Sequence, residues 1–160
     1  MNPHIKRWIT GVVAVPVLFA VIAYGTEAVF AALIIGAALA GMAEYNGMVF
    51  GPGLRREKIE TMVVSLAILL AAAAGDMTLL VTILSFAVMA VLMFNLLRTG
   101  EQGPEMVSVG GVMLGILYIP LLMSHFILLR RTPAGSLWIF FILVLAFSGD
   151  IAAYYVGRAF

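Results

Sequence analysis

The residues best suited to chemistry lie near the end of this sequence, between positions 150 and 158. Asp150, Tyr154 and Arg158 follow one another at intervals of four residues, so a helix would place a carboxylate, a phenol and a guanidinium on one face. A carboxylate and an arginine at a membrane surface suit an anionic, metal-bound group such as a nucleotide or a phospholipid headgroup. A plainer alternative is that Asp150 bonds a polar group on a neighbouring helix while Arg158 reaches the lipid headgroups.

The stretch that carries these residues is apolar from Leu137 to Gly157 and long enough to cross a bilayer. A carboxylate inside such a helix costs about 2.5–3.5 kcal/mol on insertion scales, so Asp150 is expected to face a protein interior, water or an ion. The 160-residue chain is 64% hydrophobic and only 11% charged. A soluble domain needs about 25% charged residues to cover its surface, so the composition predicts an integral membrane protein.

Composition also excludes several classes of function. There is no run of basic residues and no nucleic-acid-binding motif, so we expect no nucleic-acid partner. The chain has no cysteine, which excludes disulfides, thiolate catalysis and zinc–thiolate sites.

Six apolar stretches separated by short polar segments predict an all-α, polytopic bundle of about six transmembrane helices. The third is short, but residues 61–97 are too long for one crossing at 1.5 Å per residue, so a hairpin of two helices is expected there. No segment is polar enough for a soluble domain, so residues 1–160 are expected to form a single membrane-embedded domain. The predicted spans are Trp8–Tyr24, Ala28–Phe50, Thr61–Ala74, Met77–Leu97, Met106–Leu129 and Leu137–Gly157.

The positive charges beside these spans predict their orientation. With a cytoplasmic N-terminus, the cytoplasmic side carries seven lysines and arginines, and only Arg130 and Arg131 lie on the far side. The sequence therefore predicts an N-terminus in the cytoplasm. The seven residues are Lys6, Arg7, Arg55, Arg56, Lys58, Arg98 and Arg158.

Small residues and prolines predict how the helices pack. Pro16 and Pro120 are expected to kink their spans, since each removes a backbone donor. Gly111 and Gly115 form a GxxxG pair, and small residues also recur every four positions between 149 and 157. Such faces let helices approach closely in lipid, within one chain or in a homo-oligomer.

Two further polar residues have simpler interpretations. Asp76 is predicted to lie in a turn between two helices. His125 stands alone in an apolar stretch, and a metal site there is not expected because no second ligand lies near it in sequence.

The segment from Asp150 to Arg158, Asp-Ile-Ala-Ala-Tyr-Tyr-Val-Gly-Arg, resembles the Asp-x-x-Ala-Tyr-x-x-Gly-Arg segment of the phosphatidate cytidylyltransferases. Earlier stretches are similar to the same family: Gly115-Ile116-Leu117-Tyr118, the later Leu129-Arg130, and Glu44-Tyr45 at the end of the second span. The specific part of the resemblance is the segment 150–158, because most of the remaining sequence is generic for a membrane protein.

This resemblance implies an enzyme that transfers a cytidylyl group from CTP to phosphatidate, giving CDP-diacylglycerol and diphosphate in phospholipid biosynthesis. It implies Mg²⁺ as cofactor, membrane lipids as surroundings and the bacterial inner membrane as location. Asp150, Tyr154, Arg158 and Glu44 are then expected to bind substrate or line its cavity, with Asp150 as a candidate metal ligand.

The family carries two further segments beyond this point, which the resemblance implies hold most of the catalytic and metal-binding carboxylates. Neither is found here, so the chain looks like the N-terminal part of such an enzyme and is expected to be inactive alone. Two alternatives stay open: a small transporter or channel that uses Asp150 as an ion site, and a non-catalytic membrane module that needs a partner chain.

Overall fold

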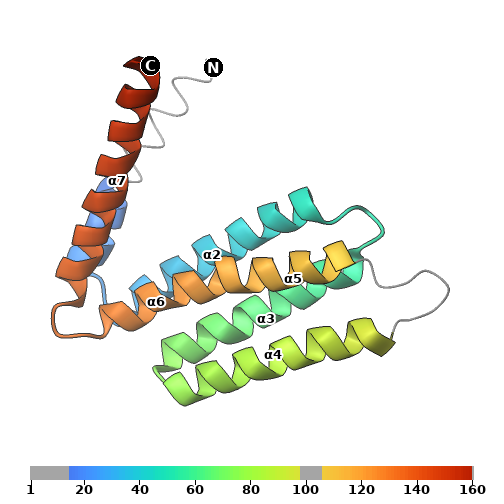
Figure 1. Cartoon of the computed structure of the whole chain (residues 1–160). Helices are drawn as coiled ribbons and strands as arrows, with labels where there is room; N and C mark the ends of the chain where they lie inside the picture. The colour runs from blue at the N-terminus through green and yellow to red at the C-terminus, as the bar shows by residue number, and fades with distance from the viewer. Residues whose placement is uncertain (1–14, 98–105, 160) are drawn as a thin grey trace. The chain divides into compact units, whose positions relative to one another are not determined.

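The computed structural model describes residues 15–97 and 106–159, and all regular secondary structure within these ranges is helical (Figure 1). The prediction of an all-α membrane protein is therefore confirmed. A helix Val15–Tyr24 comes first, followed by α2 (Glu27–Val49), α3 (Arg55–Ala74), α4 (Met77–Leu97), α5 (Met106–Tyr118), α6 (Pro120–Arg130) and α7 (Gly135–Ala159).

Four segments are long and apolar enough to cross a membrane: Glu27–Val49, Met77–Phe94, Ser108–Arg130 and Gly135–Arg158. They coincide with the second, fourth, fifth and sixth predicted spans, and they make the chain an integral membrane protein. The predicted first span begins at Trp8, and its residues 8–14 lie outside the described residues.

The third span differs from its prediction at its start. The sequence places the beginning at Thr61, whereas α3 begins at Arg55 and so includes a strongly charged first stretch. Apolar residues alone marked the predicted start, but arginine, lysine and glutamate are good helix formers and the helix continues through them. Proline and glycine at positions 52 and 53 come just before it.

The α3–α4 connection is a tight turn, as predicted for Asp76. Gly75 ends α3 with a φ of 77°, a left-handed conformation that favours glycine. The Asp76 carboxylate Oδ1 then accepts a hydrogen bond of 2.9 Å from the backbone N–H of Leu79 in the first turn of α4.

Pro120 interrupts the fifth predicted span between α5 and α6. The N–H of Ile119 still donates to the carbonyl of Gly115 at 3.1 Å, and that of Met123 to Ile119 at 3.0 Å. Proline has no N–H to donate, so the ladder loses one bond there. The regular helix is thus divided at the position where a kink was predicted, while the segment Ser108–Arg130 remains long enough for one crossing.

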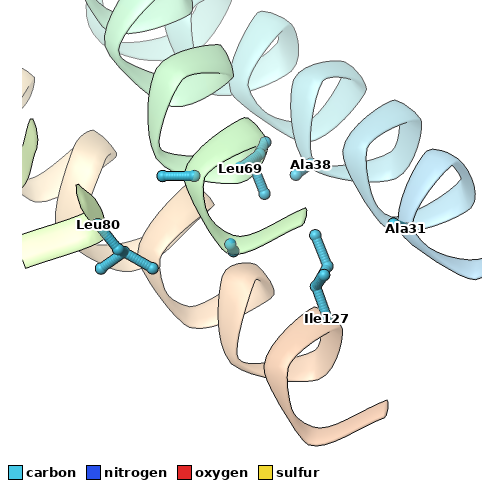
Figure 2. Packing of buried hydrophobic residues seen from close by; sticks show 7 residues of the cluster. Ala31, Ala38, Leu69, Leu80 and Ile127 are labelled. Atoms are coloured by element: carbon cyan, nitrogen blue, oxygen red, sulfur yellow. The ribbon is translucent and has the colours of Figure 1, made fainter. Parts of the chain in front are cut away.

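The chain forms two compact units, residues 31–128 and residues 1–30 with 129–160. In the first, the larger buried cluster joins α2, α3, α4 and α6, and Figure 2 shows Ala31, Ala38, Leu69, Leu80 and Ile127 around it. A second cluster brings α3, α4 and α5 together beside the end of α2; its buried members are Phe50, Ile68, Val91, Val112 and Ile116.

In the other unit the helix Val15–Tyr24 packs against α7. The rings of Phe19 and Phe140 lie 5.0 Å apart, and Ile22 and Ile139 are buried. Arg130 links the end of the helix Val15–Tyr24 to the start of α7. It donates hydrogen bonds to the carbonyl of Gly25, at 2.8 Å, and to the hydroxyl of Ser136.

These bonds give Arg130 a structural role, and Arg131 lies 3.7 Å from the carboxylate of Glu27. The two arginines that count against the predicted orientation are therefore engaged within the protein.

Candidate functional site

Helix α7 carries the segment with the specific resemblance. Asp150, Tyr154 and Arg158 all lie within it, and their four-residue spacing places them along one stripe about 12 Å long. We call these three residues the α7 polar stripe. The helical geometry on which the prediction depended is therefore present, while the chemical role of each residue stays a prediction.

All three residues of the α7 polar stripe are exposed in the structure. The Tyr154 ring has a neighbour on its own helix, Tyr155, which meets it edge to face at 5.7 Å. Gly149 and Gly157, on the small-residue face of the same helix, have open space where a side chain would project. The stripe is thus accessible to a ligand, to water or to further protein.

The chemistry of the stripe favours an anionic group. A guanidinium can hold phosphate oxygens through two parallel hydrogen bonds, and a phenol can donate one more. The carboxylate of Asp150 would contribute through a cation or a hydrogen-bond donor, since two anions repel each other.

Magnesium needs six oxygen ligands in a near-octahedral arrangement, several of which are water or substrate oxygens. Across residues 15–97 and 106–159, no three side chains of histidine, cysteine, aspartate or glutamate come together as a metal site would need. Asp150 could supply one ligand, but the described residues do not form a magnesium site by themselves. Magnesium is commonly held by one or two carboxylates together with substrate phosphates, so Mg²⁺ as cofactor stays a prediction.

Glu44 lies in α2, in the unit of residues 31–128, and its side chain is exposed. Its neighbour Tyr45 makes the structural contact: the phenol donates a hydrogen bond of 2.8 Å to the carbonyl of Gly111 on α5. A Cβ at Gly115 would lie 2.7 Å from Cε1 of the Tyr45 ring. The close packing predicted for Gly111 and Gly115 is confirmed, and its partner is α2.

Buried polar side chains join α2 to α3, a contact that was not expected from the sequence. The Thr61 hydroxyl lies 2.9 Å from Oδ1 of Asn46 and 3.0 Å from the carbonyl of Lys58, to either of which it can donate. Asn46 Nδ2 donates to the same carbonyl at 3.2 Å. Asn46 is 4% exposed and Thr61 is fully buried. An asparagine near the end of an apolar span was the available signal, because its amide needs partners there.

His125 on α6 is also exposed, and its Nδ1 lies 2.7 Å from the carbonyl of Leu121 one turn earlier. The ring therefore contacts the backbone of its own helix, and the expectation that His125 binds no metal stays a prediction.

Comparison with known proteins identifies the family. The model of the cytidylyltransferase family matches residues 5–160, nearly the whole chain. No curated protein and no solved structure gives a significant match. The family implies a transferase that uses a nucleotide such as CTP. With its apolar helices, the segment 150–158 on α7 and this match over residues 5–160, the chain belongs to the cytidylyltransferase family.

Proposed function

We propose that the chain is membrane-embedded and belongs to an enzyme that transfers the cytidylyl group of CTP to phosphatidate. The observation that supports this most directly is the family match over residues 5–160, combined with the α7 polar stripe in a membrane-spanning helix. Phosphatidate lies in the bilayer with its phosphate at the surface, so a membrane-embedded nucleotidyltransferase suits this lipid.

In the proposed reaction an oxygen of the phosphatidate phosphate attacks the α-phosphorus of CTP. The bond from that phosphorus to the bridging oxygen breaks, and diphosphate leaves with the bonding electrons. Catalysis of such transfers comes largely from positioning and from stabilising the charge on the phosphate oxygens.

Within this reaction we assign Arg158 to a substrate phosphate and Tyr154 to the wall of the substrate cavity. Asp150 would hold a donor or a cation in the same cavity. Arg158 is in the last turn of α7, about 12 Å along the helix from Asp150, so it would meet phosphates at the membrane surface.

The proposal places the N-terminus and the end of α7 in the cytoplasm, where CTP is available, and the protein in a bacterial inner membrane. The excess of lysine and arginine on that side supports this orientation. Cysteine labelling of intact cells at an introduced Arg158→Cys would test it, since cytoplasmic thiols resist membrane-impermeant reagents.

We also propose that residues 1–160 do not catalyse the transfer alone. The test is to assay transfer from labelled CTP to phosphatidate with this chain, and with this chain joined in frame to the later segments of a related cytidylyltransferase. The joined protein is expected to be active and the 160-residue chain inactive. Activity of the 160-residue chain would contradict this part of the proposal.

In the active protein, Arg158→Gln should lower kcat/KM by about 10- to 100-fold, because it removes a charge-assisted hydrogen bond. Asp150→Asn should leave membrane insertion unchanged and lower the rate of cytidylyl transfer. Tyr154→Phe should lower activity more than the matched Tyr155→Phe, since both phenols are exposed but only Tyr154 is in the stripe. Unchanged transfer by a correctly inserted Asp150→Asn protein would end the assignment of Asp150.

A further inference from the structure

Arg130, at the end of α6, contacts both helices of the unit that carries the α7 polar stripe. One terminal nitrogen of its guanidinium donates to the hydroxyl of Ser136 in the first turn of α7, and the other donates to the carbonyl of Gly25 at 2.8 Å. Gly25 directly follows the helix Val15–Tyr24. The carbon Cζ of the same guanidinium lies 5.8 Å from the centre of the Phe30 ring. We call Arg130 with Gly25, Ser136 and Phe30 the Arg130 junction.

The backbone between α6 and α7 is a tight connection. The N–H of Thr132 donates to the carbonyl of Leu129 at 3.1 Å, and the N–H of Gly135 donates to the carbonyl of Thr132 at 2.9 Å. A side chain at Gly135 would collide with the carbonyl oxygens of Leu129 and Arg130. Glycine therefore lets α7 begin directly against the end of α6, where the Arg130 side chain reaches its first turn.

Packing of α7 within the described residues is concentrated at its start. In the part of α7 whose burial is described, residues 135–158, only Gly135 and Ile139 are buried, and residues 144–158 are all exposed. Because neighbouring helices contact mainly its first turns, the direction of α7 depends on the bonds made there. The Arg130 junction supplies a hydrogen bond from a charged donor at this end of the helix.

The length of α7 converts a small change at its start into a large one at the α7 polar stripe. At 1.5 Å per residue, Arg158 lies about 33 Å along the helix from Ser136. A tilt of about 5° at Ser136 would move Arg158 by about 3 Å over this length. A misplacement of about 1 Å caused far from the reacting atoms can lower a rate by about 100-fold.

We propose that Arg130 is a positioning residue for cytidylyl transfer: it fixes the direction of α7 and so places the α7 polar stripe, without touching the substrate. Arginine suits this task because its planar guanidinium offers several N–H donors in a fixed fork and bonds two acceptors at once. The effect on the rate rests on the proposed function, whereas the direction of α7 can be measured without it.

The direction of α7 is tested by the distance between two spin labels. The chain has no cysteine, so Val17→Cys and Val156→Cys in the 160-residue chain provide two exposed labelling sites, one on each helix and neither in the α7 polar stripe. Double electron–electron resonance should give a narrow distribution of distances for this parent. Ser136→Ala should shift or broaden it by about 3 Å, the displacement expected at the end of α7. Ser136→Thr keeps the hydroxyl and should retain the narrow distribution.

Arg130→Gln should change the distribution at least as much as Ser136→Ala, because it also removes the donor to Gly25. Arg130→Lys should give an intermediate result, because an ammonium keeps the charge but lacks the planar fork. The matched control is Arg131→Gln. It removes the same charge from the next residue, which lies 3.7 Å from the exposed Glu27, and should leave the distribution unchanged. Equal distributions for the parent, Ser136→Ala and a folded Arg130→Gln protein would overturn the proposal.

The effect on the reaction is measured in the active, joined protein. Ser136→Ala should lower kcat/KM by about 10-fold and Arg130→Gln by about 100-fold, while Ser136→Thr should restore the parent rate. Unchanged transfer by Arg130→Gln, despite a broadened distribution of distances, would overturn the link between the direction of α7 and catalysis. If the joined parent itself transfers no cytidylyl group, the proposed function fails, and the spin-label distances still decide whether Arg130 directs α7.

Discussion

Two regions of this protein carry polar side chains on its apolar helices, and the two sets differ in burial and in hydrogen bonding. Where α2 meets α3 and α5, Asn46, Thr61 and Tyr45 form hydrogen bonds across helices, and Asn46 and Thr61 are buried. In the α7 polar stripe, Asp150, Tyr154 and Arg158 are exposed, although the charged groups of Asp150 and Arg158 are costly to place in lipid.

This difference distinguishes polar groups that stabilise helix packing from polar groups that are available to bind a ligand. A polar group satisfied by a neighbouring helix contributes to packing and needs no ligand to explain it. An exposed carboxylate, phenol and guanidinium on one helix stripe have no such explanation within the described residues, which makes them the better candidates for substrate binding. The comparison predicts that substitutions in the first region affect stability and those in the second affect chemistry.

The largest effect on stability is expected at Gly115. In Gly115→Val the new side chain would collide with the Tyr45 ring, which its hydrogen bond to Gly111 holds in place. The free energy of unfolding, measured by SDS titration in mixed micelles, should fall by about 3 kcal/mol. Gly110→Val on the same helix has open space and replaces glycine by a better helix former, so it should not lower the free energy of unfolding. Similar losses in both variants would contradict the packing described for α2 and α5.

A smaller loss is expected when the bond between α2 and α3 is broken on one side. Thr61→Val leaves the buried Asn46 amide without its hydroxyl partner and should lower the free energy of unfolding by about 1–3 kcal/mol. Thr82→Val, an exposed site on α4, provides the control for the same chemical change. In a double-mutant cycle, Asn46→Leu with Thr61→Val should cost less than the sum of the two single variants; strict additivity would show that the two side chains do not interact.

Tyr45→Phe separates the hydrogen bond from the packing of the ring, because it removes the phenol hydroxyl and leaves the ring beside Gly115. Interhelical hydrogen bonds in membranes contribute about 0.6 kcal/mol on average, so the unfolding free energy should fall by about that amount. Tyr118→Phe, with an exposed phenol, should change nothing measurable. A loss as large as that of Gly115→Val would mean that the hydrogen bond, not the close approach, holds α2 against α5.

The smallest effect on stability is expected in the α7 polar stripe. Asp150→Asn should change the unfolding free energy of the 160-residue chain by less than about 0.5 kcal/mol, because the side chain is exposed. The same substitution should lower cytidylyl transfer in the active, extended protein. If instead it destabilised the 160-residue chain by more than the Tyr45→Phe variant, Asp150 would belong with the structural polar groups.

The spans could be predicted from the sequence because lipid requires long apolar helices, and residues such as Gly75, Asp76 and Pro120 mark their limits locally. The start of α3 was wrong by six residues, since its first turns are charged yet helical. The α7 polar stripe could also be predicted, because a spacing of four residues fixes a helix face without any tertiary information.

The α2 contacts could not be predicted in the same way. The resemblance drew attention to Glu44, but the next two residues make the contacts, since each step along a helix turns the side chain by about 100°. Only the partner helix shows which of three consecutive polar residues is buried, and Asn46 and Thr61 are 15 positions apart.

The sequence by itself therefore determined the membrane class, the family and the stripe of chemically capable residues, because hydropathy, helical spacing and a local motif are properties of short segments. The tertiary structure alone decided which polar groups are satisfied by packing. That outcome depends on helix pairing, in which residues distant along the chain must meet before their hydrogen bonds exist.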